Sequence, residues 1–456
     1  MEGRKKKLNL EGLETSRWNS AVFLLLCVIP VFSTIAYGSV DAWAMGILAL
    51  AAALLVCLWA ADAWKTKELR FSSSRLQLPV IGLIVIGLIQ LLPVWNSGIS
   101  PELLGIPAAQ SLSMDPYATR FFVIRLIALF VFFATALAFI DSRERLKKVA
   151  LTIIIFGALM AFFAILQRLA SPEAIYGLRT TPQAIPFGSF VNQHHFAAFM
   201  EMTAGVTLGL LFGDAVAKDR KMLLGIAAGL MGIAVAFTSS RGGFISLVAT
   251  AGFVVLIQFF IKKSGTRKPQ NPRQKLFLIG GAAVVIILIF VSTLFLGGGD
   301  DLLRATGLQQ NQVDVTSGRL HFWSVAWQIF AAHPLFGAGY DAFGVAFSRY
   351  DTWTGLYRVE QAHNDYLQTL ADAGIAGFAC IAAFIFMFFR NSLAVIRDSA
   401  NRFGRDAAIG ALAGCFGIFI HSFFDFPLRT MSNAFFFLLL AVIAVAGFDL
   451  HKRSRE

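Results

Sequence analysis

Charged side chains are scarce in this sequence of 456 residues. Asp, Glu, Lys and Arg make up 14% of it, whereas soluble globular proteins contain about 25%. The deficit excludes a set of soluble domains, because too few polar side chains remain to cover their surfaces. Hydrophobic residues make up 57% of the chain, which also excludes a disordered protein.

Cysteines and nucleotide-binding motifs are scarce as well. The four cysteines all fall in apolar runs, so neither a disulfide framework nor a metal-binding spacing is indicated. The sequence contains no P-loop and no Rossmann fingerprint. Direct use of ATP or NAD is therefore not expected.

Long apolar runs dominate what is present. Twelve of them reach the length of a membrane-spanning helix, about 20 residues. They cover residues 20–37, 42–63, 78–95, 121–140, 149–169, 193–212, 222–238, 244–261, 276–296, 365–389, 406–423 and 431–449. In lipid, such a run must satisfy its own backbone hydrogen bonds. We therefore predict an all-α, polytopic integral membrane protein with about twelve transmembrane helices.

The distribution of positive charge predicts the topology. If the N-terminus is cytoplasmic, 29 of the 39 Lys and Arg residues fall in the inside segments, as the positive-inside rule requires. Both termini are then cytoplasmic, and the net charge of +12 gives no reason to expect a nucleic-acid partner. The ten other cations are all arginines. Because arginine forms forked hydrogen bonds with phosphate, these ten are candidates for an anion site.

The segment 297–362, between the ninth and tenth predicted spans, is the longest outer loop. It begins with three glycines at 297–299, and a helix is predicted from Gly318 to His333. Leu320, Trp323, Trp327 and Phe330 share one face of this helix. This face can lie at the membrane interface, form the core of a small cap, or do both. We accordingly divide the chain into 1–180 (spans one to five), 181–296 (spans six to nine), the loop 297–362, and 363–456 (the last three spans).

Histidine is concentrated on the outer face, where six of the seven map: His194, His195, His321, His333, His363 and His421. Polar residues near a membrane are costly and often functional. His363 lies where the long loop meets the tenth span, with Glu360, Asn364 and Asp365 beside it. An imidazole there can act as a general base near neutral pH or can simply cap the helix end. Further along, Gly374 and Gly377 are expected to let another helix approach closely.

Other outer turns also carry polar residues. The turn TSSRGG at 238–243 places Arg241 before two glycines, which is typical of a phosphate-binding nest or of an ordinary turn with a snorkelling arginine. Asn192 and His195 precede an intramembrane Glu201. A further turn at 421–429 supplies His421, Asp425 and Arg429. Adjacent histidines on a helix point about 100° apart, so His194 and His195 form a poor metal-binding pair and no metal is expected.

These residues together resemble a known family. His363-Asn364, nine residues, Gly374, two residues and Gly377 resemble the H-N-x9-G-x-x-G motif of the bacterial O-antigen ligase family, which includes related polysaccharide polymerases. Further similar stretches are Ser240–Gly243, Gly318-Arg319 with Trp323, His333–Gly339, His421 with Asp425-Phe426, and Phe190–Asn192 with His195-Phe196. The resemblance covers roughly residues 185–430. His194 stands where Asn is common in the family, so it receives no role.

The resemblance implies a GT-C-like glycosyltransferase of the bacterial inner membrane that needs no metal or other cofactor. Its donor is a glycan on undecaprenyl diphosphate, and its site faces the periplasm. The acceptor is a sugar hydroxyl on lipid A-core for a ligase, or on another lipid-linked oligosaccharide for a polymerase. The stretches at 190–196 and 421–426 slightly favour a polymerase.

The resemblance also implies residue roles. His363 is the expected base, with Asp365 or Glu360 as its orienter by proximity. Arg241 and Arg319 are the first candidates for binding the donor diphosphate. Weaker candidates are Arg429 and Arg349, and further site candidates without a role are Asn192, His195, Asn364, His421 and Asp425.

A transporter or flippase is the alternative function. Such proteins have polar or broken segments near the bilayer midplane, arranged in two related halves. Arg125, Arg168 and Glu201 are the charges within the predicted spans that such a site would use, and the two halves show no symmetry. The sequence therefore favours the transferase over the transporter.

Overall fold

The computed structural model describes residues 16–93, 111–171, 173–182, 184–260, 318–352, 359–399 and 401–453. The elements of the first half are α1 (Arg17–Ile35), η1 (Tyr37–Ser39), α2 (Ala42–Thr66), α3 (Gln77–Gln90), α4 (Pro116–Phe139), α5 (Arg143–Ala170), β1 (Ala174–Ile175), β2 (Arg179–Thr180), α6 (Gln193–Phe212), α7 (Lys218–Phe237) and α8 (Arg241–Phe260). Those of the second half are α11 (Arg319–Ala332), α12 (Phe343–Tyr350), α13 (Asp365–Asp398), α14 (Arg402–His421), η3 (Pro427–Arg429) and α15 (Met431–Arg453). The two strands form one short antiparallel hairpin.

The described helices match the predicted membrane spans. Nine of them are long and apolar enough to cross a membrane. Two shorter apolar helices are α3 and the segment Met431–Ala446 of α15. Eleven of the twelve predicted spans therefore coincide with a described helix. The twelfth, 276–296, lies outside the described residues, as do the three glycines at 297–299. A mostly helical, polytopic membrane protein is confirmed.

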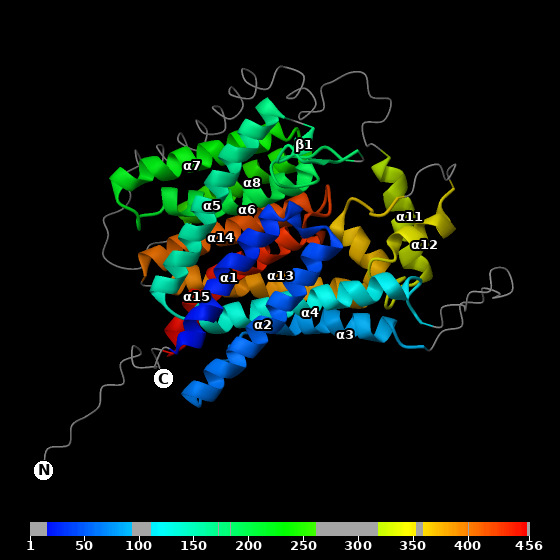
Figure 1. The fold of residues 1–456 in the computed structure, drawn as a ribbon, viewed down its shortest axis with the longest axis horizontal. Coiled ribbons are helices and arrows are strands. Elements are labelled where there is room, and N and C mark those ends of the chain that lie inside the picture. Colours follow the sequence, from blue (N-terminus) through cyan, green and yellow to red (C-terminus); the bar gives the residue numbers. More distant parts are fainter. Residues whose placement is uncertain are drawn as a thin grey trace, which may run out of the picture.

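The bundle has a central layer of α13, α14 and α15 (Figure 1). On one edge of this layer lie α5, α6, α7 and α8, and on the opposite edge lie α3 and α4. Small residues allow α6 and α14 to pack closely: a Cβ on Gly205 would come within 2.6 Å of the Gly414 nitrogen. Such close approach is typical of helix pairs in membranes. It makes α6 the most deeply buried of the described spans.

Helix α13 is broken near its beginning. Gly374 has φ 62° and ψ −162°, a conformation that is open essentially only to glycine. The backbone N–H groups of Ile375 and Ala376 donate instead to the carbonyls of Pro334 (2.8 Å) and Leu335 (3.2 Å). The expectation that another helix approaches at Gly374 is therefore wrong. A loop approaches there, because the break exposes backbone donors that a loop can satisfy.

Gly374→Ala is expected to destabilise the protein strongly. The new Cβ would lie 2.5 Å from the Leu335 carbonyl, and the backbone strain alone costs about 1–3 kcal/mol. Gly225→Ala, in α7, is the matched control, since a Cβ there meets nothing within 4 Å and alanine favours a helix by about 1 kcal/mol. Thermal unfolding in detergent should show a lower melting temperature only for Gly374→Ala. Equal melting temperatures would contradict the break at Gly374.

Helices α11 and α12 form a small cap at one end of the bundle (Figure 1). Its core contains Val325, Ala326 and Ile329 from α11, packed with Phe343 and Phe347 from α12. The predicted helix from Gly318 to His333 is confirmed to within a residue at each end. Of the two roles expected for its apolar face, the core of the cap is wrong for two residues, whereas a place at the membrane interface stays a prediction. Leu320 and Trp327 of that face are 60% and 56% exposed, because the smaller residues on the other side supply the core.

Gln90, the last residue of α3, connects the membrane bundle to the cap by side-chain hydrogen bonds. Its side-chain NH₂ donates to the carbonyls of Phe336 (2.6 Å) and Asp372 (2.8 Å), and its carbonyl accepts from the Tyr340 N–H (3.0 Å). This side chain is fully buried and gives a hydrogen-bond partner to three backbone groups of the cap and of α13. The cap is thus held firmly over the end of the bundle at which α13 begins.

Candidate functional site

The ends of several helices meet beneath the cap. Helices α6, α8 and α13 begin here and α14 ends here, so the alternation of the spans brings together residues that are far apart in the sequence. The candidate residues at this end are Asn192, His195, Arg241, Arg319, His363, Asn364, Asp365, His421, Asp425 and Arg429. Most of the predicted candidates are therefore on the same side of the bundle.

His363 and Asp425 form the central pair of this region. The Nδ1 atom of His363 lies 3.1 Å from Oδ1 of Asp425, which is itself buried, whereas the His363 side chain is 31% exposed. The His363 ring packs against the rings of Phe426 and Phe322. His363 therefore has a hydrogen-bonded Nδ1 atom and a ring that remains partly accessible.

The backbone beside His363 is fixed by Asn364. Its side-chain oxygen accepts from the N–H groups of Tyr366 (3.0 Å) and Leu367 (3.1 Å) and so caps α13. Its NH₂ donates to the carbonyl of Phe423 (3.2 Å), which ties α13 to the turn that carries Asp425. His363 itself has φ 51°, an uncommon value for a residue other than glycine. The capping interpretation thus applies to Asn364 rather than to His363.

The structure gives His363 a carboxylate partner that proximity in the sequence did not indicate. Asp365 accepts a hydrogen bond from the hydroxyl of Ser422 (3.0 Å), because as the first residue of α13 it faces the end of α14. Glu360 is exposed and lies beside Gly344 of the cap. The carboxylate bonded to His363 is that of Asp425, 62 positions away in the sequence. Proximity in the sequence therefore did not reveal Asp425 as the partner of His363.

Asp425 lies among several imidazoles. Burial alone would raise the pKa of its carboxyl group, but the hydrogen bond with His363 and the nearby rings of His194 and His195 hold that pKa well below its usual range. Asp425 is therefore ionised at neutral pH.

Within the described residues, no group of three or more His, Cys, Asp and Glu side chains is arranged to hold a metal ion.

Asp425→Asn should lower stability in a pH-dependent way. A group whose pKa is lowered by folding stabilises the protein above its unfolded pKa, about 4, and loses this contribution as the pH falls further. We expect a cost of about 1.5–3 kcal/mol, typical of a hydrogen bond to a charged group. The melting temperatures of wild type and variant should differ by a constant amount from pH 8 to pH 5 and converge below about pH 4. A difference that disappears between pH 5 and pH 8 would contradict an ionised Asp425.

Two further histidines are held by partners that sequence reasoning missed. Nδ1 of His421 lies 2.9 Å from Oε1 of Glu201, and both side chains are almost fully buried. Nδ1 of His195 lies 2.8 Å from the hydroxyl of Thr430. The intramembrane position of Glu201 was a signal for such a pair, whereas nothing in the sequence indicates Thr430.

The other side of the site is built from the beginnings of α6 and α8. Asn192 caps α6 by accepting from the N–H of His194 (2.8 Å). Ser240 accepts from the N–H of Gly243 (3.1 Å) at the beginning of α8, and its hydroxyl lies 2.8 Å from Nδ1 of His194. His194, for which no role was expected, therefore links the two helices. Gly242 of α8 packs against the ring of His421.

The predicted arginines have different surroundings. Arg241 is the first residue of α8, where the helix dipole also favours an anion. Arg319 is the first residue of α11 and lies within electrostatic reach of His194. Arg349 is exposed on the cap helix α12. These three remain candidates for binding a negatively charged group.

Arg429 has a structural role. Its guanidinium donates to Asp341 (2.7 Å) and to Asp372, and its carbonyl accepts from Arg125. Because two carboxylates already neutralise Arg429, it does not fit the predicted role of a diphosphate ligand. It fixes the turn 421–430 against α13 and the cap.

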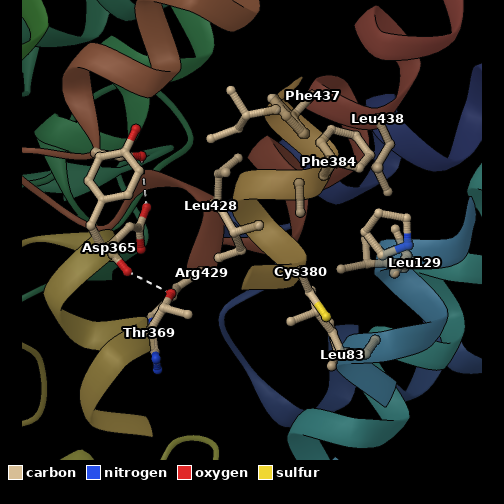
Figure 2. Close-up of a pocket in the computed structure, with 18 of the residues that line it drawn as sticks. Leu83, Leu129, Asp365, Thr369, Cys380, Phe384, Leu428, Arg429, Phe437 and Leu438 are labelled. Carbon is tan, nitrogen blue, oxygen red and sulfur yellow. Dashed lines mark hydrogen bonds between the residues drawn. The ribbon is translucent and has the colours of Figure 1, made fainter. Parts of the chain in front are cut away.

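An apolar pocket lies beside this turn. It has a volume of about 220 Å³ and is enclosed by α3, α4, α13, α15 and the end of α14. Figure 2 shows Asp365 and Thr369 on one side of it, and Leu83, Leu129, Cys380, Phe384 and Leu438 on the other. The hydrogen bonds of Asp365 to Ser422 and of Arg429 to its two aspartates place the polar groups at the end nearest His363.

Comparison with protein-family models gives a match over part of the chain. Residues 226–382 match the family model described as O-antigen ligase. This segment contains Arg241, Arg319 and His363 but not the turn with His421 and Asp425, so it is shorter than the expected resemblance. No curated protein matches the chain. The match supports assigning residues 226–382 to the O-antigen ligase family, whose members are glycosyltransferase-like enzymes.

Proposed function

We propose that this protein transfers a glycan from a polyprenyl diphosphate to a sugar hydroxyl on the outer, periplasmic face of the bacterial inner membrane. The observation that carries the proposal is the His363–Asp425 pair, which lies beneath the cap at the end of the bundle where Arg241 and Arg319 also lie. This end is opposite to the Lys-rich loops, which the positive-inside rule assigns to the cytoplasm.

In the proposed reaction, His363 is the general base. Asp425 accepts the Nδ1–H of His363, so that Nε2 carries the lone pair. Nε2 takes the proton of the acceptor hydroxyl while the hydroxyl oxygen forms a bond to the anomeric carbon of the donor. The bond between that carbon and the diphosphate oxygen breaks, and the electron pair leaves with the polyprenyl diphosphate.

The leaving diphosphate needs positive charge as its bond breaks. Arg241 and Arg319 supply it in this proposal, since a guanidinium stays charged and forms a fork with phosphate oxygens. The beginning of α8 adds its dipole at the same place. Such fixed charges stabilise the transition state because they need no reorganisation during the reaction.

Reconstitution tests the proposal. The purified protein in lipid nanodiscs is mixed with lipid-linked glycans extracted from the host membrane, and the products are separated by size. We expect longer glycans together with release of free polyprenyl diphosphate. Transbilayer movement of these lipids in liposomes without any release of diphosphate would instead establish a flippase and overturn the proposal.

A deletion strain distinguishes ligase from polymerase. Accumulation of single lipid-linked repeats would identify a polymerase. Accumulation of lipid-linked polymer, with loss of long chains from lipid A-core, would identify a ligase.

A further inference from the structure

A second pair of an imidazole and a carboxylate lies beneath the cap, and the proposed reaction does not use it. Oε1 of Glu201, from α6, lies 2.9 Å from Nδ1 of His421, the last residue of α14. Their side chains are 0% and 1% exposed. The other ring nitrogen of His421, Nε2, is buried and has no hydrogen-bond partner among the described residues. Such an atom costs free energy, so its position in the fold needs an explanation.

The Nε2 atom of His421 lies against the first turn of α8. A Cβ added to Gly242 would lie 3.3 Å from Nε2 and 3.2 Å from Cδ2 of this ring, so the absence of a side chain lets the imidazole come this close. In the same turn, the N–H groups of Gly243 (3.1 Å) and Phe244 (2.9 Å) donate to the hydroxyl and the carbonyl of Ser240. The N–H of Gly242 has no partner among the described residues. A buried imidazole nitrogen and a backbone donor therefore lie at the same helix beginning.

The number of protons on the Glu201–His421 pair decides what Nε2 can do. With one proton the pair has a net negative charge, which is costly to bury, and the ionised Asp425 within electrostatic reach adds to that cost. With two protons the pair is neutral. These two protons form either an imidazolium beside a carboxylate or a neutral imidazole beside a carboxylic acid, and Nε2 carries a hydrogen in both forms. Burial therefore makes Nε2 of His421 a hydrogen-bond donor.

One short turn holds both imidazole–carboxylate pairs. The carbonyl of His421 accepts from the N–H groups of Phe424 (2.8 Å) and Asp425 (3.0 Å), which fixes His421 relative to the partner of His363. The His363 side chain is 31% exposed and its partner is ionised, which suits a base. The His421 side chain is buried against α8, which suits a donor to an anion. The same two residue types therefore acquire opposite roles through their different burial.

We propose that His421 is a further catalytic residue, whose Nε2–H donates a hydrogen bond to a diphosphate oxygen at the beginning of α8. Glu201 is its positioning residue, and the N–H of Gly242 binds the same diphosphate beside Arg241. The hydrogen bond strengthens as negative charge develops on the leaving oxygen, and no proton is transferred. This inference rests on the proposed function for the identity of the anion.

Two substitutions of His421 separate the donor role from a structural one. The amide nitrogen of glutamine can take the place of Nε2, whereas that of asparagine can take the place of Nδ1. His421→Gln therefore keeps a donor to the anion, and His421→Asn keeps the partner of Glu201. At saturating lipid-linked glycan, we expect transfer to be about 10²-fold slower in His421→Asn and within about threefold of wild type in His421→Gln. The reverse order, or equal rates in the two variants, would overturn the proposal.

Binding of inorganic diphosphate measures the anion site without any glycan. The affinity of the purified protein in nanodiscs is determined by isothermal titration calorimetry. His421→Asn should bind diphosphate about tenfold more weakly than wild type, and His421→Gln should stay within about threefold. Binding that depends on His421 in this way, without glycan transfer by the wild type, would keep the anion site and overturn the proposed function. Glycan transfer by the wild type, with equal diphosphate affinity in all three proteins, would do the reverse.

Gly242→Ala decides the question if the His421 variants fail to fold. Its methyl group would displace the His421 ring and would lie 3.0 Å from Cβ of Phe424, while alanine itself favours a helix. The affinity for inorganic diphosphate should fall by about threefold or more, because the displaced Nε2–H loses its hydrogen-bond geometry. Gly252→Ala, in the same helix, is the matched control, since a Cβ there meets nothing within 4 Å, and it should bind diphosphate as the wild type does. An unchanged affinity in Gly242→Ala would overturn the proposal.

Discussion

His363→Ala should lower the rate of glycan transfer by about 10²–10⁴-fold, the usual contribution of a positioned general base. The variant removes the only group that the proposal gives for accepting the proton of the sugar hydroxyl, while Asn364 still caps α13 through its own side chain. The protein should therefore insert and fold. Transfer is measured with purified protein in nanodiscs, as release of polyprenyl diphosphate over time.

His333→Ala is the matched control for this variant. His333 ends α11 in the same cap and is partly buried, but it lies outside the His363–Asp425 pair. It should keep most of the wild-type rate. If His363→Ala transferred glycan at the wild-type rate while folding normally, His363 would not be the base, and the pair with Asp425 would have only a structural role.

The membrane spans were predictable because hydrophobicity is a local property of the sequence. Each apolar run must form a helix in lipid, whatever its neighbours are, so eleven of the twelve runs coincide with described helices. Their ends were less predictable. The apolar run 78–95 is helical only up to Gln90, whose side chain forms a hydrogen bond with the Phe336 carbonyl. Helix α13 is broken at Gly374. Both features depend on the loop 334–340, which hydropathy along one helix does not reveal.

The candidate site was predictable by residue type and side of the membrane, but not by pairing. His363 and Asp425 were both expected on the outer face, yet their hydrogen bond joins segments that are 62 residues apart. Sequence proximity favoured Asp365, which instead bonds to Ser422. Arg429 was expected to be available for a ligand, but Asp341 and Asp372 neutralise it. The sequence shows which side chains are charged. Only the packed structure shows which of these charges are neutralised by an oppositely charged neighbour.

Arg241→Lys should lower the rate of transfer by about 10²–10³-fold, the effect typical of removing one donor that stabilises a developing negative charge. Lysine keeps the positive charge but loses the planar fork that bonds two phosphate oxygens together. Arg319→Lys should act in the same way if both arginines contact the diphosphate. The effect is measured as the initial rate at saturating lipid-linked glycan, because the loss belongs to the transition state rather than to binding alone.

Substitutions of two other arginines serve as controls for Arg241→Lys. Arg120→Lys changes an exposed arginine near the beginning of α4, at the same end of the bundle. It should leave the rate within about twofold of wild type, as expected for a surface substitution. Arg429→Lys removes a fork that already holds two aspartates, so it should lower the melting temperature first. A full rate in Arg241→Lys would reduce Arg241 to a turn residue. An equal loss of rate in Arg120→Lys would show that the transfer depends on the general positive field at this end of the bundle rather than on a fork at α8.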